Sequence, residues 1–131
     1  MNVRLKVVEL VVQDMGRSLA FYRLLGLDVP AAADGEPHVE HELPGGLKIA
    51  WDTVETIESF HPGFTFHPGA GNMALAFEAD SPEEVDKVYA ELTAAGYEGE
   101  MEPFDAFWGQ RYAVVHDPDG NGVDIFAPLP R

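Results

Sequence analysis

Two carboxylates stand on strand-like segments of this sequence that are mostly apolar. Glu9 interrupts the β-branched run of residues 5–12, and Asp124 stands in the segment 122–128 near the end of the chain. A carboxylate among apolar neighbours can have a raised pKa that suits a general base, and its charge also attracts cationic ligands. The residue types therefore allow either proton transfer or cation binding, and they do not decide between the two.

Aromatic residues gather in two segments of loop-like composition. Aromatic faces stack on planar ligands and attract cations, and loops held by a rigid scaffold commonly carry function. Any single ring is more often a core residue, but the number of rings in these segments favours contact with a ligand. The rings are Phe60, Phe64, Phe66, Phe104, Phe107 and Trp108.

Besides the carboxylates, histidine is the residue type in this chain that commonly binds metals, and the chain has no cysteine. The absence of cysteine excludes disulfides, thiolate metal sites and cysteine nucleophiles. Two of the histidines stand three residues apart and would face opposite sides of a strand. The favoured interpretation is that the histidines are scattered over the surface and turns. They are His38, His41, His61, His67 and His116.

The acidic composition limits the classes of partner. The 131 residues include 23 acidic and 8 basic side chains, for a formal net charge of −15. Such a surface repels nucleic acid and anionic membranes, and it either maintains solubility or attracts cationic ligands. No apolar run approaches the roughly 18 residues that cross a bilayer, and the N-terminus lacks the features of a signal peptide. We expect a cytoplasmic protein of one domain that binds neither nucleic acid nor membranes.

The predicted elements repeat in order within the chain. The first half has a strand at 5–12, a helix from the N-cap Asp14 to Gly26, and extended segments at 27–30, 38–43 and 47–53. The second half has a strand at 72–79, a helix that begins at Ser81 and Pro82, and strands at 97–101, 111–116 and 122–128. The simplest interpretation is an α+β fold of two βαβββ modules, at about residues 1–53 and 72–131, joined by an aromatic-rich connection at 54–71.

Three stretches of the chain together resemble the vicinal oxygen chelate superfamily, which holds glyoxalase I, ring-cleaving dioxygenases and bleomycin-binding proteins. The opening helix signature corresponds to VVQDMGRSLAFYRLLGL, the second strand-to-helix step to GNMALAFEAD, and the closing strands to WGQRYAVVHDPDGNGVDIFAP. Within the last stretch, DPDGN has the residue types that hold a tight reversal between antiparallel strands. The resemblance implies that the two modules form a cupped mixed sheet with helices on the outer face and a ligand or metal inside.

The metal-dependent members of this family place ligands on the first and last strands of each module. The resemblance puts those positions at Val7, Ala50, Asn72 and Asp124. Valine and alanine have no donor atoms, and asparagine is a poor ligand for the metals that imidazole and carboxylate select. We therefore expect no metal, no other cofactor and no catalytic residue. In this respect the chain resembles the metal-free drug-binding branch of the family.

Strand alternation names the side chains that would share the cup with these four positions. Small residues on a concave sheet leave volume for a bulky ligand. Arg111 follows the WG-R pattern of the bleomycin-binding branch and is a further candidate, although a structural salt bridge explains it as well. The expected lining comprises Val7, Glu9, Ala50, Asn72, Ala74, Asp124 and Phe126.

The predicted function is a metal-free binding protein that sequesters a bulky aromatic or cationic natural product, as self-resistance members of the family do. The alternative is a glyoxalase- or dioxygenase-like enzyme that uses a non-family metal site, or Glu9 or Asp124 as a base. A third interpretation is a scaffold or sensor subunit without a small ligand. Because family members commonly close their cups with a partner chain, we also expect a two-fold homodimer.

Overall fold

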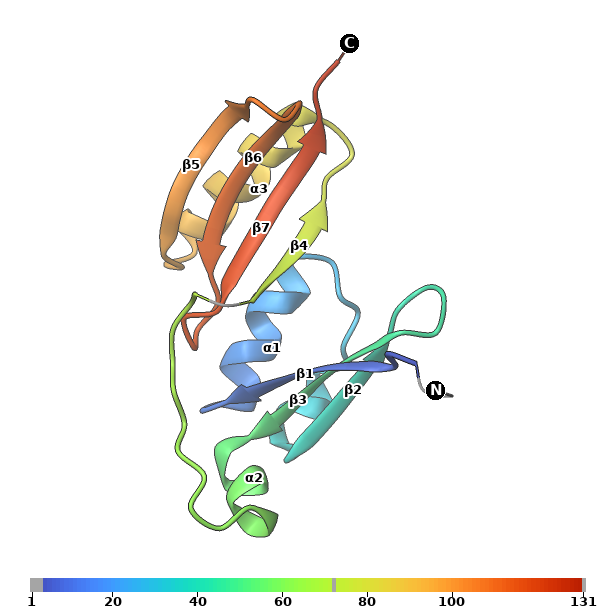
Figure 1. Cartoon of the computed structure of the whole chain (residues 1–131), viewed down its shortest axis with the longest axis vertical. Coiled ribbons are helices and arrows are strands. Elements are labelled where there is room, and N and C mark those ends of the chain that lie inside the picture. The colour runs from blue at the N-terminus through green and yellow to red at the C-terminus, as the bar shows by residue number, and fades with distance from the viewer. Residues whose placement is uncertain (1–3, 72, 131) are drawn as a thin grey trace. The chain divides into compact units, whose positions relative to one another are not determined.

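The computed structural model describes residues 4–71 and 73–130. The chain divides into two compact units, Met1–His67 and Pro68–Arg131, which we call module 1 and module 2. Figure 1 shows the elements of each module. In module 1 they are β1 (Val7–Val12), α1 (Met15–Leu24), a short 3-10 helix η1 (Ala31–Gly35), β2 (His38–Glu42), β3 (Lys48–Thr53) and α2 (Val54–Phe60). In module 2 they are β4 (Ala74–Glu78), α3 (Pro82–Ala94), β5 (Gly99–Ala106), β6 (Gln110–His116) and β7 (Gly122–Pro128).

Module 1 is built on a three-stranded mixed sheet in the order β1-β3-β2. The central strand β3 pairs parallel with β1 and antiparallel with β2. Helix α1 begins where the Asp14 side chain accepts a hydrogen bond from the backbone N–H of Arg17, as expected for an N-cap. On one face of the sheet, the buried Trp51 of β3 lies against Tyr22 of α1, with ring centroids 5.6 Å apart. The other face of this sheet carries the polar residues described below.

One segment of module 1 differs from the sequence-based prediction, and a second has a helix for which no prediction was made. Residues 27–30 do not form a strand, because their backbone bonds locally: Leu27 N–H donates to the Tyr22 carbonyl and Val29 N–H to the Leu27 carbonyl. The aromatic-rich connection at 54–71, for which no secondary structure was predicted, begins with helix α2. That helix starts at Thr53, whose side chain accepts a hydrogen bond from the Thr56 N–H, and it buries Ile57.

Module 2 is built on a four-stranded mixed sheet in the order β4-β7-β6-β5. β4 pairs parallel with β7, and the other neighbours are antiparallel. Helix α3 covers one face of this sheet (Figure 1) and buries Val85 and Leu92 there. Its predicted start is confirmed, because the Ser81 side chain accepts a hydrogen bond from the Glu84 N–H and Pro82 occupies the first turn. We call the opposite side of this sheet the open face of module 2.

The strand predicted at 97–101 is longer and lies further along the chain, at Gly99–Ala106. This strand, β5, pairs antiparallel with β6 as far as Ala106 opposite Gln110, and its register is irregular before Phe104. The tight turn between β6 and β7 is confirmed: the Asp117 carboxylate accepts hydrogen bonds from the N–H groups of Asp119 and Asn121. This turn sets the register that places β6 beside β7.

The predicted α+β class is therefore confirmed, with two βαβββ-like modules, mixed sheets and three α-helices among the described residues. No helix in the described part of the chain is both long enough and apolar enough to cross a membrane.

Candidate functional site

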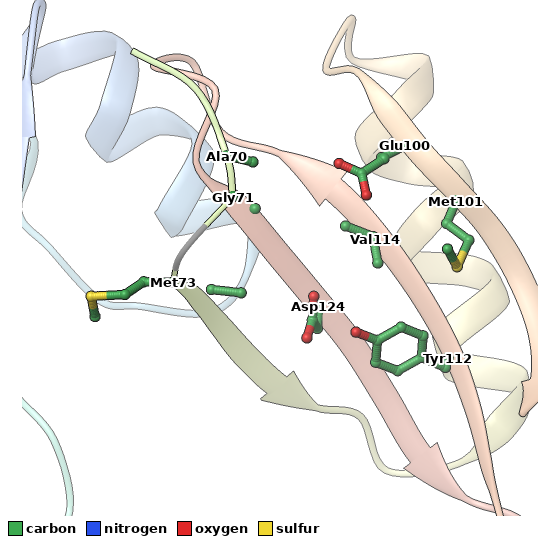
Figure 2. Close-up of a pocket in the computed structure, with 10 residues that line it drawn as sticks. Ala70, Gly71, Met73, Glu100, Met101, Tyr112, Val114 and Asp124 are labelled. Atoms are coloured by element: carbon green, nitrogen blue, oxygen red, sulfur yellow. The ribbon is translucent and has the colours of Figure 1, made fainter. Parts of the chain in front are cut away.

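A pocket of about 460 Å³ opens on the open face of module 2 (Figure 2). This volume is within the range of about 300–1,000 Å³ typical of small-molecule sites. Two predicted ligand-binding residues, Ala74 and Asp124, line it. The full lining comprises Ala70, Gly71, Met73, Ala74, Glu100, Met101, Tyr112, Val114, Gly122 and Asp124.

Strand register explains why these side chains share one face. Val114 pairs with Met101 of β5 and with Asp124 of β7, so the three side chains stand side by side. Their strand neighbours alternate to the face covered by α3, where Ala113, Val115 and Ile125 are buried. The space between the polar groups remains open because β4 and β7 contribute the small residues Ala74 and Gly122.

The polar groups of the pocket are acidic. Figure 2 shows the Tyr112 hydroxyl pointing toward the Asp124 carboxylate, with Glu100 on the neighbouring strand. Burial and then the hydrogen bond to Asp124 raise the pKa of Tyr112 to about 12. The hydroxyl therefore stays protonated and donates to the carboxylate. Glu100 is paired with His116, whose Nε2 lies 2.5 Å from its oxygen, whereas no basic side chain among the described lining residues pairs with Asp124.

Aromatic rings continue from the pocket along the β5–β6 hairpin. The Tyr112 ring lies 5.2 Å from Trp108 and 5.9 Å from Phe104 between centroids, both edge to face. Trp108 also meets Phe107 edge to face at 5.1 Å, and its indole N–H donates to Gln110. Phe107 is 97% exposed and Trp108 is 49% exposed. We call Phe104, Phe107, Trp108 and Tyr112 the aromatic cluster.

Three other predicted residues of module 2 have different surroundings. Phe126 pairs with Tyr112 across β6 and β7 and so shares the open face. Arg111 precedes Tyr112 on β6 and faces the side of α3, where its guanidinium forms ion pairs with Asp86 and Asp105 at 2.9 and 3.1 Å. This is the structural salt bridge that the sequence left open as the alternative, and a role of Arg111 in ligand binding stays a prediction. Asn72 lies outside the described residues.

The predicted aromatic residues of the connection belong to module 1. Phe60 ends α2 and is largely exposed, whereas Phe64 and Phe66 are half-buried. The Phe64 ring lies 5.6 Å from the ring of His61. None of the three lines the module 2 pocket, and their contact with a ligand stays a prediction.

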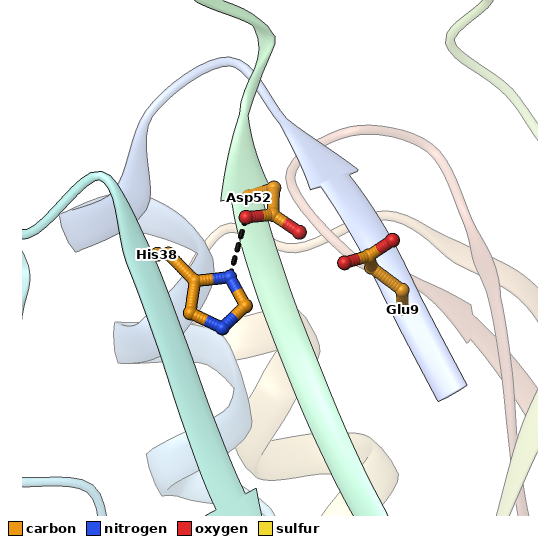
Figure 3. Close-up of side chains that lie close together, drawn as sticks. All are labelled: Glu9, His38 and Asp52. Carbon is orange, nitrogen blue, oxygen red and sulfur yellow. Dashed lines mark hydrogen bonds and ion pairs between the residues drawn. The ribbon is translucent and has the colours of Figure 1, made fainter. Parts of the chain in front are cut away.

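A second polar group of side chains gathers on module 1, on the face of the sheet away from Trp51 (Figure 3). Glu9, His38 and Asp52 each offer one ligand atom, and these atoms lie within 4.8 Å of one another. His38 pairs with Asp52 across β2 and β3, and Nδ1 of its ring lies 2.5 Å from an Asp52 oxygen. We call these three residues the β1–β3 cluster.

Hydrogen bonds and charges shift the pKa values in and beside this cluster. The hydrogen bond to Asp52, followed by burial, raises the pKa of Glu9. Hydrogen bonds to Glu40 and then to Asp52 raise the pKa of His38. The pKa of Glu40 is lowered by His38 and then by Lys48. The predicted residues Val7 and Ala50 lie beside the cluster on β1 and β3; Val7 is partly exposed and Ala50 is fully buried.

The residues at the four family metal positions do not fit a metal ion. Val7 and Ala50 offer no donor atom, and the Asp124 carboxylate accepts a hydrogen bond from Tyr112. One carboxylate with a tyrosine partner is too few ligands for a divalent ion. We therefore assign no metal-dependent step to these four positions in this chain.

Sequence reasoning missed Tyr112, Glu100 and Met101 in the pocket, and His38 in the β1–β3 cluster. Alternation within residues 111–116 places Tyr112 and Arg111 on opposite faces of the strand, but it does not tell which of the two faces the pocket. His38 gave no local signal, because its partners are far along the chain and reach it only through the register of the sheet.

A model of the Glyoxalase/Bleomycin resistance protein/Dioxygenase superfamily matches residues 4–125. No curated protein matches the chain.

Solved structures with this fold include a glyoxalase/bleomycin resistance protein/dioxygenase from Nocardioides, which is 26% identical with a TM-score of 0.74 over 98% of this chain and 85% of that one. A family enzyme of the same description from Burkholderia phytofirmans PsJN is 23% identical, with a TM-score of 0.79 over 97% of this chain and 100% of that one. A protein of unknown function from Agrobacterium tumefaciens strain C58 is 26% identical, with a TM-score of 0.73 over 98% of this chain and 97% of that one.

Proposed function

Because the chain belongs to the glyoxalase/bleomycin resistance protein/dioxygenase superfamily, we propose that it is a small-molecule-binding protein that captures a bulky aromatic or cationic ligand in the module 2 pocket. One observation carries the proposal: an acidic pocket lies beside a partly exposed aromatic cluster, and Tyr112 belongs to both.

The charge of the pocket supports a cationic ligand. Asp124 and Glu100 both line it; Glu100 is paired with His116, and no basic side chain among the described lining residues neutralises Asp124. A cation that enters the pocket comes close to these carboxylates and is attracted by their charge. An anion meets repulsion there and also from the net charge of −15 of the whole chain.

The aromatic and thioether groups support a planar, bulky ligand. Trp108 and Tyr112 present ring surface, which stacks on planar groups and favours cations. Met73 and Met101 add flexible apolar contacts that adapt to an irregular shape. These contacts hold a ligand without any bond to a metal, so sequestration of a natural product in this pocket requires only binding.

Assembly belongs to the same proposal. Several large apolar side chains are exposed in the single chain, among them Phe107, Met73 and Phe60. Exposed apolar residues of this size favour burial against a partner. We propose a two-fold homodimer that covers part of this surface.

The test uses one reporter and two probes of opposite charge. The chain has two tryptophans, so Trp51→Phe leaves Trp108 beside the pocket as the only one. We expect the planar cation ethidium to bind and to change Trp108 fluorescence, and the planar anion anilinonaphthalene sulfonate to bind much more weakly.

Asp124→Asn provides the matched control, because the substitution keeps the shape of the side chain and removes its charge. We expect weaker ethidium binding in this variant, measured by calorimetry, with unchanged thermal unfolding. Equal affinity for both probes, or equal ethidium binding by the wild type and Asp124→Asn, contradicts a cation-selective pocket.

A further inference from the structure

We propose that module 1 binds one divalent transition-metal ion through Glu9, His38 and Asp52. This site lies on a different module from the proposed ligand pocket and does not depend on it. The proposal rests on the convergence of three potential ligand atoms, on the orientation of one imidazole ring, and on the burial of one carboxylate.

The convergence follows from the sheet. β3 is the central strand, so Asp52 has β2 on one side and β1 on the other. His38 is its direct partner on β2, and Glu9 is a diagonal neighbour on β1, where Val11 is the direct partner. Figure 3 shows the three side chains pointing toward a common region.

The spacing of the ligand atoms suits one ion. Bonds from zinc to nitrogen or oxygen are about 2.0–2.2 Å, so the ligand atoms around one ion lie roughly 3–3.5 Å apart. The three atoms of the cluster lie within 4.8 Å of one another. Small side-chain rotations close the remaining difference, and two of the three residues, Glu9 and His38, are exposed enough to rotate.

The imidazole of His38 is oriented for coordination. Its Nδ1 faces Asp52, whereas its Nε2 lies 2.8 Å from a Glu40 oxygen. The other Glu40 oxygen accepts a hydrogen bond from Lys48 at 3.0 Å. A carboxylate on the far nitrogen of a histidine is the usual outer partner of a metal ligand, because it holds the ring and directs the free nitrogen to the ion.

The charge of the cluster favours a cation at the same point. The Asp52 side chain is only 5% exposed, and the Glu9 carboxylate is its neighbour. Two adjacent carboxylates repel each other when both are ionised, and either a shared proton or a bound cation relieves that repulsion. One imidazole nitrogen with two carboxylates is a ligand set for Zn²⁺, Fe²⁺ or Mn²⁺ rather than for Ca²⁺ or Mg²⁺, which prefer oxygen alone.

This site differs from the family positions. Val7 and Ala50 precede Glu9 and Asp52 by one step on the same face of the same strands. The family set uses no residue of the strand that carries His38, and it draws on both modules. The proposed site draws on module 1 alone.

The chain also supplies a matched control. His116 also has one carboxylate on each ring nitrogen, with Glu98 3.3 Å from Nδ1 and Glu100 2.5 Å from Nε2, but among the described residues no further carboxylate joins either nitrogen as Glu9 joins His38 and Asp52. The oxygens of Glu98 and Glu100 therefore cannot converge with one nitrogen on a single ion. A substitution of His116 removes a histidine with similar acidic surroundings and should not affect binding of the metal.

The experiment titrates Zn²⁺ into chelator-treated full-length protein by calorimetry. We expect one site per chain, which Glu9→Gln and His38→Gln each weaken by more than about tenfold and His116→Gln leaves unchanged. Glu40→Gln removes the outer carboxylate and should also weaken Zn²⁺ binding, because losing such an outer partner costs about 10–100-fold in metal affinity. In the wild type, the ring signals of His38 in a histidine-selective NMR spectrum should shift with one equivalent of Zn²⁺.

Circular dichroism identifies any variant that fails to fold, and the NMR readout on the wild type does not depend on the variants. The proposal is overturned if Zn²⁺ does not shift the His38 signals. It is also overturned if folded Glu9→Gln binds Zn²⁺ as the wild type does, which indicates diffuse attraction to an acidic surface.

Discussion

Replacing Trp108 with alanine should separate ligand binding from folding in module 2. Trp108 is 49% exposed and meets its aromatic neighbours by their edges. Truncating a fully buried tryptophan costs about 3–5 kcal/mol of the free energy of unfolding. Because about half of Trp108 remains in water, we expect about half of that loss in the free energy of unfolding, about 1.5–2.5 kcal/mol.

Trp108→Ala should also weaken the binding of a planar ligand. Removing an aromatic ring that stacks on a planar base costs about 1–3 kcal/mol of binding free energy. On that scale, the dissociation constant for ethidium rises by about 5- to 150-fold in Trp108→Ala. Calorimetry measures this directly, without the fluorescence of the residue that is removed.

Trp51 provides the comparison for stability. It is fully buried against Tyr22 in module 1 and does not line the pocket. Trp51→Ala should lose the full 3–5 kcal/mol or so in denaturant unfolding, and Trp51→Phe should bind ethidium as the wild type does. If Trp108→Ala is as unstable as Trp51→Ala and still binds normally when folded, Trp108 is a core residue and the stacking argument is refuted.

Three further outcomes are expected. Ethidium affinity should fall as salt rises, and it should fall less steeply in Asp124→Asn, because screening acts on the charge that this variant lacks; equal slopes contradict a role for Asp124. The hydrogen bond to Glu100 raises the pKa of His116 above its ordinary 6.5. His116 therefore stabilises the fold fully below pH 6.5, and this contribution is lost as the pH rises through the raised value; the stability difference between the wild type and His116→Gln, from urea unfolding, should be largest in acid, and a difference that grows with pH contradicts this assignment. Sedimentation should give a dimer, and a stable monomer at micromolar concentration counts against the proposed assembly.

Much of the fold could be predicted because its signals are local. Asp14, Ser81 and Pro82 set helix starts through hydrogen bonds and backbone angles that span only a few residues. The turn at Asp117 is likewise closed by its own side chain. Such features need no knowledge of the tertiary structure, and the structure confirms them.

The errors in the elements came where tertiary contacts outweigh local composition. Residues 54–60 precede an aromatic, proline-rich stretch and gave no clear helical pattern, but a cap at Thr53 and the burial of Ile57 stabilise a short helix there. Phe104 was expected in or next to a loop, whereas pairing with Tyr112 keeps it in β5. The partner of Phe104 belongs to another strand, whereas the cap of α2 is local and only the burial of Ile57 depends on the tertiary structure.

For the candidate sites, the sequence by itself determined which residue types alternate on each strand, and so placed Glu9, Ala74 and Asp124 among the candidates. Only the tertiary structure decided which face of β6 is open, because the docking of α3 assigns Tyr112 to the pocket and Arg111 to the covered side. The same holds for His38. Its approach to Glu9 and Asp52 depends on strand register, which joins residues far apart in the chain and leaves no trace in their spacing.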